Sequence, residues 1–131
     1  MSTYPILTQE QFKDAIKDIS QYELEAKKAQ QLAFIFKLID TNNELHRELS
    51  TDGNVESLSP DDVKLYKETI DENKESLLNQ IERIHLINIE LVRRGILSES
   101  KASAEEKKLH DDVKKRTESN EHENEREGVV L

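Results

Sequence analysis

The side chains that could support catalysis or metal binding lie far apart along this chain of 131 residues. The four histidines, His46, His85, His110 and His122, are widely separated, and there is no cysteine. No two histidines lie at a metal-ligand spacing, and the sequence contains no glycine-rich phosphate loop, G-x-S-x-G turn or H-E-x-x-H motif. We therefore expect no enzyme activity, no catalytic residue, no bound metal and no cofactor.

Two pairs of adjacent acidic residues come closest to an acid–base site. Asp61 with Asp62, and Glu105 with Glu106, could in principle hold one proton donor and one acceptor. Negative charge at a helix N-terminus, or a solvated helix face, explains these pairs with fewer assumptions. Similarly, His85 lies beside the main apolar seam of its predicted helix, and we interpret it as an edge residue that touches a partner rather than as a metal ligand.

The composition predicts a protein built from long helices. Charged residues make up 36% of the chain and hydrophobic residues 34%, with three glycines and two prolines. The net charge of -9 argues against a nucleic acid or an anionic membrane as partner, because both favour clustered lysine and arginine. No apolar run is long enough to cross a membrane and the N-terminus does not resemble a signal peptide, so we expect a cytoplasmic location, with the nucleus as a second compartment.

The stretch from Ser59 to Gly95 predicts one long helix around which the rest of the chain is organised. Ser59 is an N-cap residue, Pro60 suits the first helical position, and Gly95 can adopt the left-handed conformation that ends a helix. Apolar residues recur along it every seven positions: Val63, Ile70, Leu77, Ile84 and Leu91. A helix with one apolar seam requires another helix to cover that seam.

Two capping boxes predict two earlier helices. Thr8 and Gln11 begin a short helix, and Ser20 with Glu23 begins a longer one that runs to about Ser50. The short helix has an apolar face made by Phe12, Ala15, Ile16 and Ile19, and the seam of the longer one consists of Leu24, Gln31, Ile35, Leu38, Asn42, Leu45 and Leu49. Two long amphipathic helices joined by a loop at residues 51–58 are expected to pack as an antiparallel hairpin.

Residues 98–131 have a different character from the rest of the chain. Most of this segment is highly charged, and its sizeable apolar residues before the last few positions are Leu109 and Val113. Such a segment cannot bury a core, so we expect it to be disordered. The predicted fold class is all-α: an antiparallel two-helix coiled-coil hairpin with a short N-terminal helix in residues 1–97, followed by a disordered C-terminal tail in residues 98–131.

Three amides, Asn42, Asn73 and Gln80, fall in the predicted seam between the two long helices. A buried amide can fix the alignment of two helices at some cost in stability. The alternative is that these residues lie at the edge of the seam and are partly wet, which is the favoured interpretation for three amides in a layer of two helices.

A second apolar stripe remains outside the seam. On the earlier long helix, Ala26, Ala29, Ala33 and Phe36 fall on a stripe away from the seam, and on the later one Leu78, Leu86 and Ile89 also lie off the main seam. Exposed apolar surface of this kind marks a binding site, and the alternative is that the short helix folds back and covers part of it. The candidate partner-binding residues are Ala29, Ala33, Phe36, Tyr66, Leu78, His85, Leu86 and Ile89.

Three segments of the chain resemble a known family. EQFKDAI at residues 10–16, SQYEL at 20–24 and DDVKLYKETIDEN at 61–73 are similar to the small fungal ATPase-dedicated assembly chaperones of the proteasome, also described as translation-machinery-associated proteins. The resemblance covers Glu10 to Arg94. It implies a helical hairpin that binds the N-terminal coiled-coil region of one ATPase subunit of the regulatory-particle base, helps that subunit pair with its neighbour and then leaves.

The residues themselves leave two other functions open. The first is a constitutive coiled-coil adaptor subunit of another complex, such as a prefoldin-like or tethering assembly, which would be permanently bound and poorly soluble alone. The second is a small enzyme, which turnover or a metal requirement would reveal.

Overall fold

The computed structural model describes residues 7–50 and 58–129, and the side chains are described as far as residue 117. Within these residues there are four helices and no strand: α1 (Gln9–Ala15), α2 (Gln21–Ser50), α4 (Pro60–Arg93) and α5 (Glu99–Val129). The predicted all-α class is therefore confirmed. Apart from residue 58, the predicted loop at 51–58 lies outside the described residues.

Local hydrogen bonds fix where the first three helices begin. The Thr8 backbone N–H donates to Gln11 Oε1 (2.9 Å), and the Gln11 N–H donates to Thr8 Oγ1 (3.1 Å), which completes the predicted capping box. Ser20 and Ser59 each accept, through the side-chain hydroxyl, a hydrogen bond of 3.1 Å from the backbone N–H three residues later. These starts are encoded locally, within four consecutive residues.

The end of α4 depends on the backbone freedom of Gly95. Its φ angle of +75° lies in the left-handed region, which side chains disfavour. The Gly95 N–H donates to the Val92 carbonyl (2.9 Å) and the Ile96 N–H donates to the Leu91 carbonyl (3.0 Å). These two bonds form a Schellman motif, which ends α4 at the predicted glycine and directs the chain toward α5.

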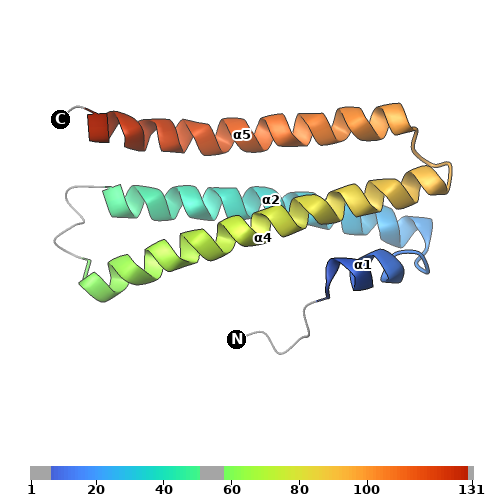
Figure 1. Cartoon of the computed structure of the whole chain (residues 1–131), viewed down its shortest axis with the longest axis horizontal. Coiled ribbons are helices and arrows are strands. Elements are labelled where there is room, and N and C mark those ends of the chain that lie inside the picture. The colour runs from blue at the N-terminus through green and yellow to red at the C-terminus, as the bar shows by residue number, and fades with distance from the viewer. Residues whose placement is uncertain (1–6, 51–57, 130–131) are drawn as a thin grey trace.

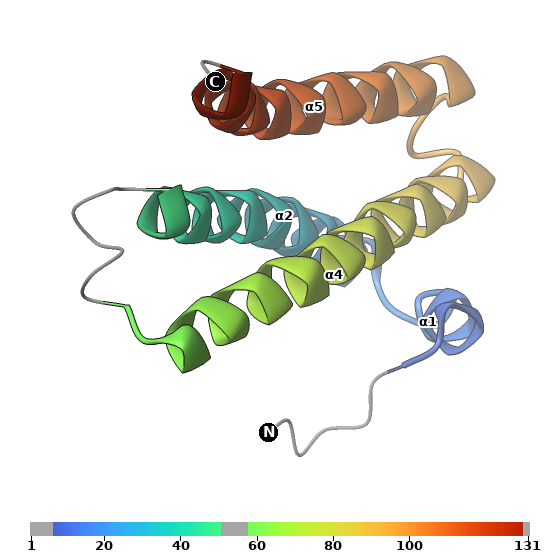
Figure 2. The ribbon, with the colours of Figure 1, turned by 60° about the vertical axis from the view of Figure 1, so that its left-hand side comes forward.

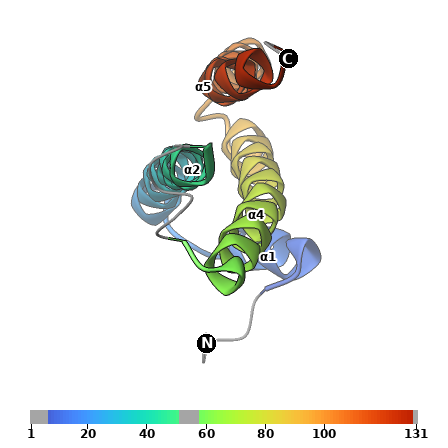
Figure 3. The same ribbon diagram turned by 90° about the vertical axis from the view of Figure 1, so that its left-hand side faces the viewer.

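The helices α2 and α4 lie side by side and run in opposite directions (Figure 1). α5 lies along one side of this α2–α4 pair and contacts both of its members, whereas α1 packs against α4 (Figure 2). A view along the long helices shows α5 and α1 on opposite sides of α4 (Figure 3). The short helix α1 therefore covers part of α4, and the long helix α5 covers a different part of the α2–α4 pair.

Two buried clusters correspond to these two covers. The first joins α1 to the α2–α4 pair and consists of Phe12, Ile16, Leu24, Leu86, Ile87 and Leu91. The second joins α5 to the pair and consists of Ile35, Ile39, Ile84 and Leu109, with Leu32, Phe36, Leu77, Ile81 and Val113 packed against it. The apolar seams of α2 and α4 thus form a core that depends on both additional helices.

The prediction of a disordered tail is wrong for the first part of residues 98–131. Residues from Glu99 onward form α5, whose first turn is capped by Ser98 through a hydrogen bond of 3.1 Å from the Lys101 N–H. Ala102 and Leu109 are buried. Together with Val113 they recur at helical spacing on one face, so even a highly charged segment can bury a narrow apolar stripe. The described residues contain three long helices, so the prediction of a two-helix hairpin followed by a disordered tail is not confirmed.

The amides of the seam are paired with each other. Asn73 Nδ2 donates to Asn42 Oδ1 (2.9 Å), and Asn42 Nδ2 donates to the Ile70 carbonyl (3.2 Å). Asn42 is buried and Asn73 is half-buried. For this pair the structure favours alignment of the two helices over the wet-edge interpretation, whereas Gln80 is half-buried and has no such role.

Removing residues 98–131 is expected to lower the melting temperature without abolishing cooperative unfolding. Loss of Leu109 and Ala102 uncovers Ile84, which should cost about 2–4 kcal/mol, while the cluster of Phe12, Leu24 and Leu91 keeps all its members. Circular dichroism melts of the full chain and of residues 1–97 measure the difference. An unchanged melting temperature would show that α5 does not pack in solution, and a broad, non-cooperative melt would show that residues 1–97 do not fold alone.

Candidate partner-binding surface

The eight predicted partner-binding residues do not form one continuous surface. Phe36 and His85 contact α5, and Leu86 is buried in the cluster with α1. Of the remaining five, Tyr66 is half-buried and the others are exposed: Ala29, Ala33, Leu78 and Ile89. Whether any of them binds a partner stays a prediction, but the structure determines which are available while all helices are in place.

Phe36 and His85 lie where α5 crosses the α2–α4 pair. The Arg116 guanidinium stands 4.4 Å from the centre of the Phe36 ring, in cation–π geometry. His85 Nδ1 lies 2.6 Å from Glu106 Oε1, and the other oxygen of the same carboxylate accepts a hydrogen bond from Asn88 Nδ2 (3.2 Å). A partner could reach these two side chains fully only if α5 moved away.

Leu86 is covered by the short helix, as the alternative interpretation of the stripe required. It belongs to the cluster that contains Phe12 of α1, Ile16 directly after α1 and Ile87 of its own helix. A helical wheel gives the direction of a side chain but not what covers it, which is why Leu86 was grouped with exposed residues. Leu86 is therefore a core residue, and replacing it with a charged residue should destabilise the fold whether or not it affects binding.

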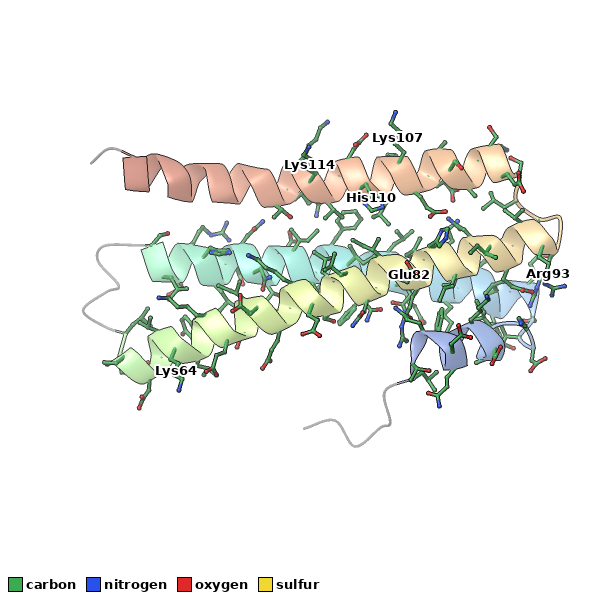
Figure 4. All side chains as sticks on the ribbon, viewed as in Figure 1. Lys64, Glu82, Arg93, Lys107, His110 and Lys114 are labelled. Atoms are coloured by element: carbon green, nitrogen blue, oxygen red, sulfur yellow. The ribbon has the colours of Figure 1, made fainter. Side chains whose placement is uncertain are left out.

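On α4, Leu78 and Ile89 form the exposed part of the predicted stripe. Leu78 is 68% exposed and Ile89 is 45% exposed. They lie seven residues before and four residues after His85, which places all three on the same side of α4. Glu82 lies between them in sequence and is also exposed (Figure 4). This side of α4 is next to α5 and remains open to a partner.

Sequence reasoning missed a polar clamp that holds α1 against α4. The guanidinium of Arg94 donates hydrogen bonds to the backbone carbonyls of Ile16 (3.0 Å), Lys17 (3.3 Å) and Ile19 (2.8 Å), where α1 ends. Its Nε also donates to Glu90 Oε2 (2.7 Å). Carbonyls at a helix C-terminus have no partner within the helix, so Arg94 acts as a cap supplied from another helix. The signal in the sequence was the E-x-x-R-R pattern at the end of α4.

Glu90 is buried, and two arginines stabilise the negative charge of its carboxylate. Arg93 donates to both of its carboxylate oxygens (2.9 and 2.6 Å), and Arg94 donates to one. The hydrogen bonds from Arg93, together with the one from Arg94, lower the pKa of Glu90 to about 2, although burial acts in the opposite direction. Arg93 lies at the end of α4 and is largely exposed (Figure 4).

The depressed pKa of Glu90 predicts a loss of stability in acid. A carboxyl group whose pKa is lower in the folded state stabilises the fold above its ordinary pKa of 4.5, and this contribution disappears as the pH falls toward about 2. The variant Glu90→Gln should be less stable than the parent at pH 7 and should lose less stability between pH 4.5 and pH 2. Urea titrations across this range measure the effect, with Glu82→Gln as the exposed control; equal pH slopes for both variants would contradict the assignment.

A second arginine supports the other end of α1. The Arg83 guanidinium lies 4.7 Å from the centre of the Phe12 ring and donates to the Leu7 carbonyl (2.7 Å). Partial burial lowers the pKa of this guanidinium. Arg83 and Arg94 therefore attach both ends of α1 to α4, and both contacts keep Leu86 covered.

A partly open cavity of about 290 Å³ lies between α5 and the α2–α4 pair. Its apolar lining is Leu32, Phe36, Ile84 and Leu109, and its polar lining is Lys28, Asn88, Glu105, Lys108 and Asp112. Asn88 Oδ1 is buried and has no hydrogen-bond partner among the described residues. Protein interiors are normally close-packed and their polar atoms paired, so the packing of α5 on the α2–α4 pair is incomplete at this junction.

Other features of the described residues bear on the kind of protein. No group of three or more histidine or acidic side chains lies close enough to hold a metal ion within residues 7–50 and 58–117. None of the described helices is both long and apolar enough to cross a bilayer. Besides Leu78 and Ile89, five large hydrophobic side chains are exposed among the described residues, including Tyr22 and Phe34 on α2 and Leu65 on α4.

These features define a small helical-bundle protein with apolar side chains exposed on its long helices. Residues 8–98 match the model of a family described as the TMA17 helical domain, which covers more than half of the chain. The chain belongs to this family. No curated protein and no solved structure gave a significant match.

Proposed function

We propose that this chain is a non-enzymatic assembly chaperone. In this proposal it binds the coiled-coil region of an ATPase subunit of the proteasome regulatory particle, promotes pairing with the neighbouring subunit during assembly of the base, and then leaves. The observation that carries the proposal is the family match over residues 8–98, since it spans the same helices, Glu10 to Arg94, in which the resemblance to proteasome assembly chaperones lies. The proposed place of action is the cytoplasm, with the nucleus as a second compartment.

The shape and surface of α4 support helix-to-helix recognition. A helix of 34 residues offers a long straight face, and a coiled-coil partner can lie along such a face. Leu78 and Ile89 are exposed on the same side of this helix and three turns apart, as apolar anchors for a partner helix would be. Acidic and basic residues surround them, which suits the polar rim of a reversible contact.

Replacing Leu78 or Ile89 with aspartate is expected to weaken partner binding about tenfold to a hundredfold while leaving the melting temperature nearly unchanged. Each substitution places an unpaired charge in the apolar contact of the complex, whereas in the free protein it lies in water. The measurement is a binding isotherm with purified coiled-coil fragments of the proteasomal ATPases, together with a melt of each variant.

Leu65→Asp is the matched control, because Leu65 is exposed on the same helix but points away from the side that carries Leu78 and Ile89. If Leu65→Asp weakens binding as much as the other two variants, the contact does not involve this side of α4. If no ATPase fragment binds the parent protein, the proposed function is wrong.

The rival proposal of a constitutive adaptor subunit predicts a different distribution in the cell. A chaperone should be recovered with incomplete base assemblies and be absent from finished proteasomes, whereas an adaptor subunit should remain with its mature complex. Affinity purification of the tagged chain, followed by size separation and mass spectrometry, distinguishes the two.

A further inference from the structure

We propose that the face of the α2–α4 pair beneath α5 is a docking site for an amphipathic helix of a partner protein, and that this helix binds by taking the place of α5. The proposal deepens the proposed function, since it assigns a surface to the coiled-coil partner. It defines a groove made by Leu32, Phe36, Ile84 and Asn88, which we call the α5 groove.

The first argument is that α5 fills the α5 groove poorly. Over its described side chains α5 buries only Ala102 and Leu109, with Val113 partly buried. The cavity of about 290 Å³ at this junction has room for several additional methylene groups, since one water molecule takes up only about 30 Å³ in the liquid. The unpaired Asn88 Oδ1 also faces this junction and could accept a hydrogen bond. A helix with larger apolar side chains would make contacts that α5 does not.

The second argument is that polar contacts at the rim hold α5 in place. Lys28 Nζ lies 2.6 Å from Glu105 Oε2, and Arg116 lies 3.6 Å from Asp40. Glu106 contacts His85 at the same rim and also accepts a hydrogen bond from Asn88 Nδ2 (3.2 Å). Each of the three charged pairs, Lys28–Glu105, His85–Glu106 and Asp40–Arg116, includes a side chain that is about half exposed or more, so water can replace these contacts at small cost. Release of α5 is therefore compatible with a folded protein.

The third argument concerns the chemistry of the incoming helix. The groove offers Lys28 and His85 at one end and Asp40 with the Phe36 ring further along. The α5 residues that face these groups are, in order along the helix, two acidic residues, two apolar residues and one arginine: Glu105, Glu106, Leu109, Val113 and Arg116. A competing partner helix should repeat this order of charges and carry larger apolar residues. Leu78 and Ile89 flank the groove on α4 and would contact the second helix of a coiled coil.

The experiment uses the full chain and a synthetic helix as probe. The probe is a fluorescein-labelled peptide of residues 98–117 with two substitutions, Lys108→Met at a residue that lines the cavity and Ala102→Leu at the buried alanine of α5. Binding is followed by fluorescence anisotropy. The proteins are the parent, Leu109→Glu, which loosens α5, and Lys107→Glu, a control on the side of α5 that points away from α2 and α4 (Figure 4).

In a fourth protein, a cross-link holds α5 in the α5 groove. It carries Lys28→Cys and Glu105→Cys joined by a short bismaleimide, and because the natural chain has no cysteine, only these two positions react. Its control is the same double variant before cross-linking. The engineered positions are those whose parent side chains touch across the groove at 2.6 Å.

We expect Leu109→Glu to bind the probe at least about tenfold more tightly than the parent, because α5 no longer competes for the groove. Lys107→Glu should bind like the parent, and cross-linking should abolish binding. Equal binding by the Leu109 and Lys107 variants, or undiminished binding after cross-linking, would overturn the proposal. Unfolding of the whole chain by Leu109→Glu would also overturn the proposal, because release of α5 would then not leave a folded protein. Recovery of Leu109→Glu as a dimer that does not bind the probe would overturn it as well, because the occupant of the α5 groove would then be a second copy of this chain.

The probe assay requires no ATPase fragment, which separates the two proposals. If the probe binds as expected but no ATPase fragment binds, the α5 groove is a docking site for a helix and the proposed function is wrong. Binding of an ATPase fragment to the cross-linked protein as tightly as to its uncross-linked control would support the proposed function and reject the groove as its site.

Discussion

Replacing Ile84 with aspartate is expected to unfold the protein. Ile84 is almost completely buried and belongs to the cluster in which α2, α4 and α5 meet. The substitution removes a large apolar side chain and introduces a charge without a buried cationic partner, which together should cost about 4 kcal/mol or more. Small domains have a total stability of about 5–15 kcal/mol, so a loss of this size removes much of it. Far-ultraviolet circular dichroism and urea unfolding at neutral pH measure the effect.

Leu78→Asp is the control for this prediction, because it makes the same kind of change six residues earlier on the same helix at a position that is 68% exposed. We expect it to change the free energy of unfolding by less than about 0.5 kcal/mol. Similar losses for the two variants would mean that α4 does not present Ile84 to the core and Leu78 to solvent.

Replacing Arg94 with methionine is expected to release α1 from the bundle. Methionine keeps most of the apolar stem but leaves three carbonyls at the end of α1 without their donor and removes one partner of the buried Glu90. Loss of the donor to these partly buried carbonyls, together with loss of one partner of the buried Glu90 carboxylate, should cost about 2–4 kcal/mol in total. Hydrogen exchange of the α1 amides should therefore become much faster, and the global melting temperature should fall.

Arg93→Met provides the comparison. Arg93 also binds Glu90, but its side chain is 61% exposed and none of its described contacts reaches α1. The Arg93 variant should leave exchange in α1 close to that of the parent. If both arginine variants accelerate this exchange equally, the clamp works through the charge of Glu90 and not through the carbonyls of α1.

The sequence predicted the helix boundaries well because their signals are local. The boundaries of α2 agree with the prediction, and the cap at Ser59 and the left-handed Gly95 lie where the chain requires them. α5 was missed because its apolar residues are few and widely spaced. Ser98 as a cap, followed by Ala102, Leu109 and Val113 on one face, was the available signal.

The candidate surface was predicted less completely than the fold. Periodicity gave the directions of Phe36, Leu78 and Leu86 but not the positions of the helices that cover two of them. Coverage depends on contacts between residues 70 or more positions apart, such as those of Arg94 with α1 and of Glu105 with Lys28. A wheel drawn for one helix contains no information about such contacts.

The Asn42–Asn73 pair also has a consequence for how the chain reaches its native state. An apolar seam with a seven-residue repeat can in principle close in several shifted arrangements that bury similar area. From the observed pairing, a shift of one repeat would place Asn73 against Ile35 or Leu49, where its amide finds no amide partner. Shifted arrangements should therefore be less stable than the native one, and the pair selects a single alignment of a repetitive seam.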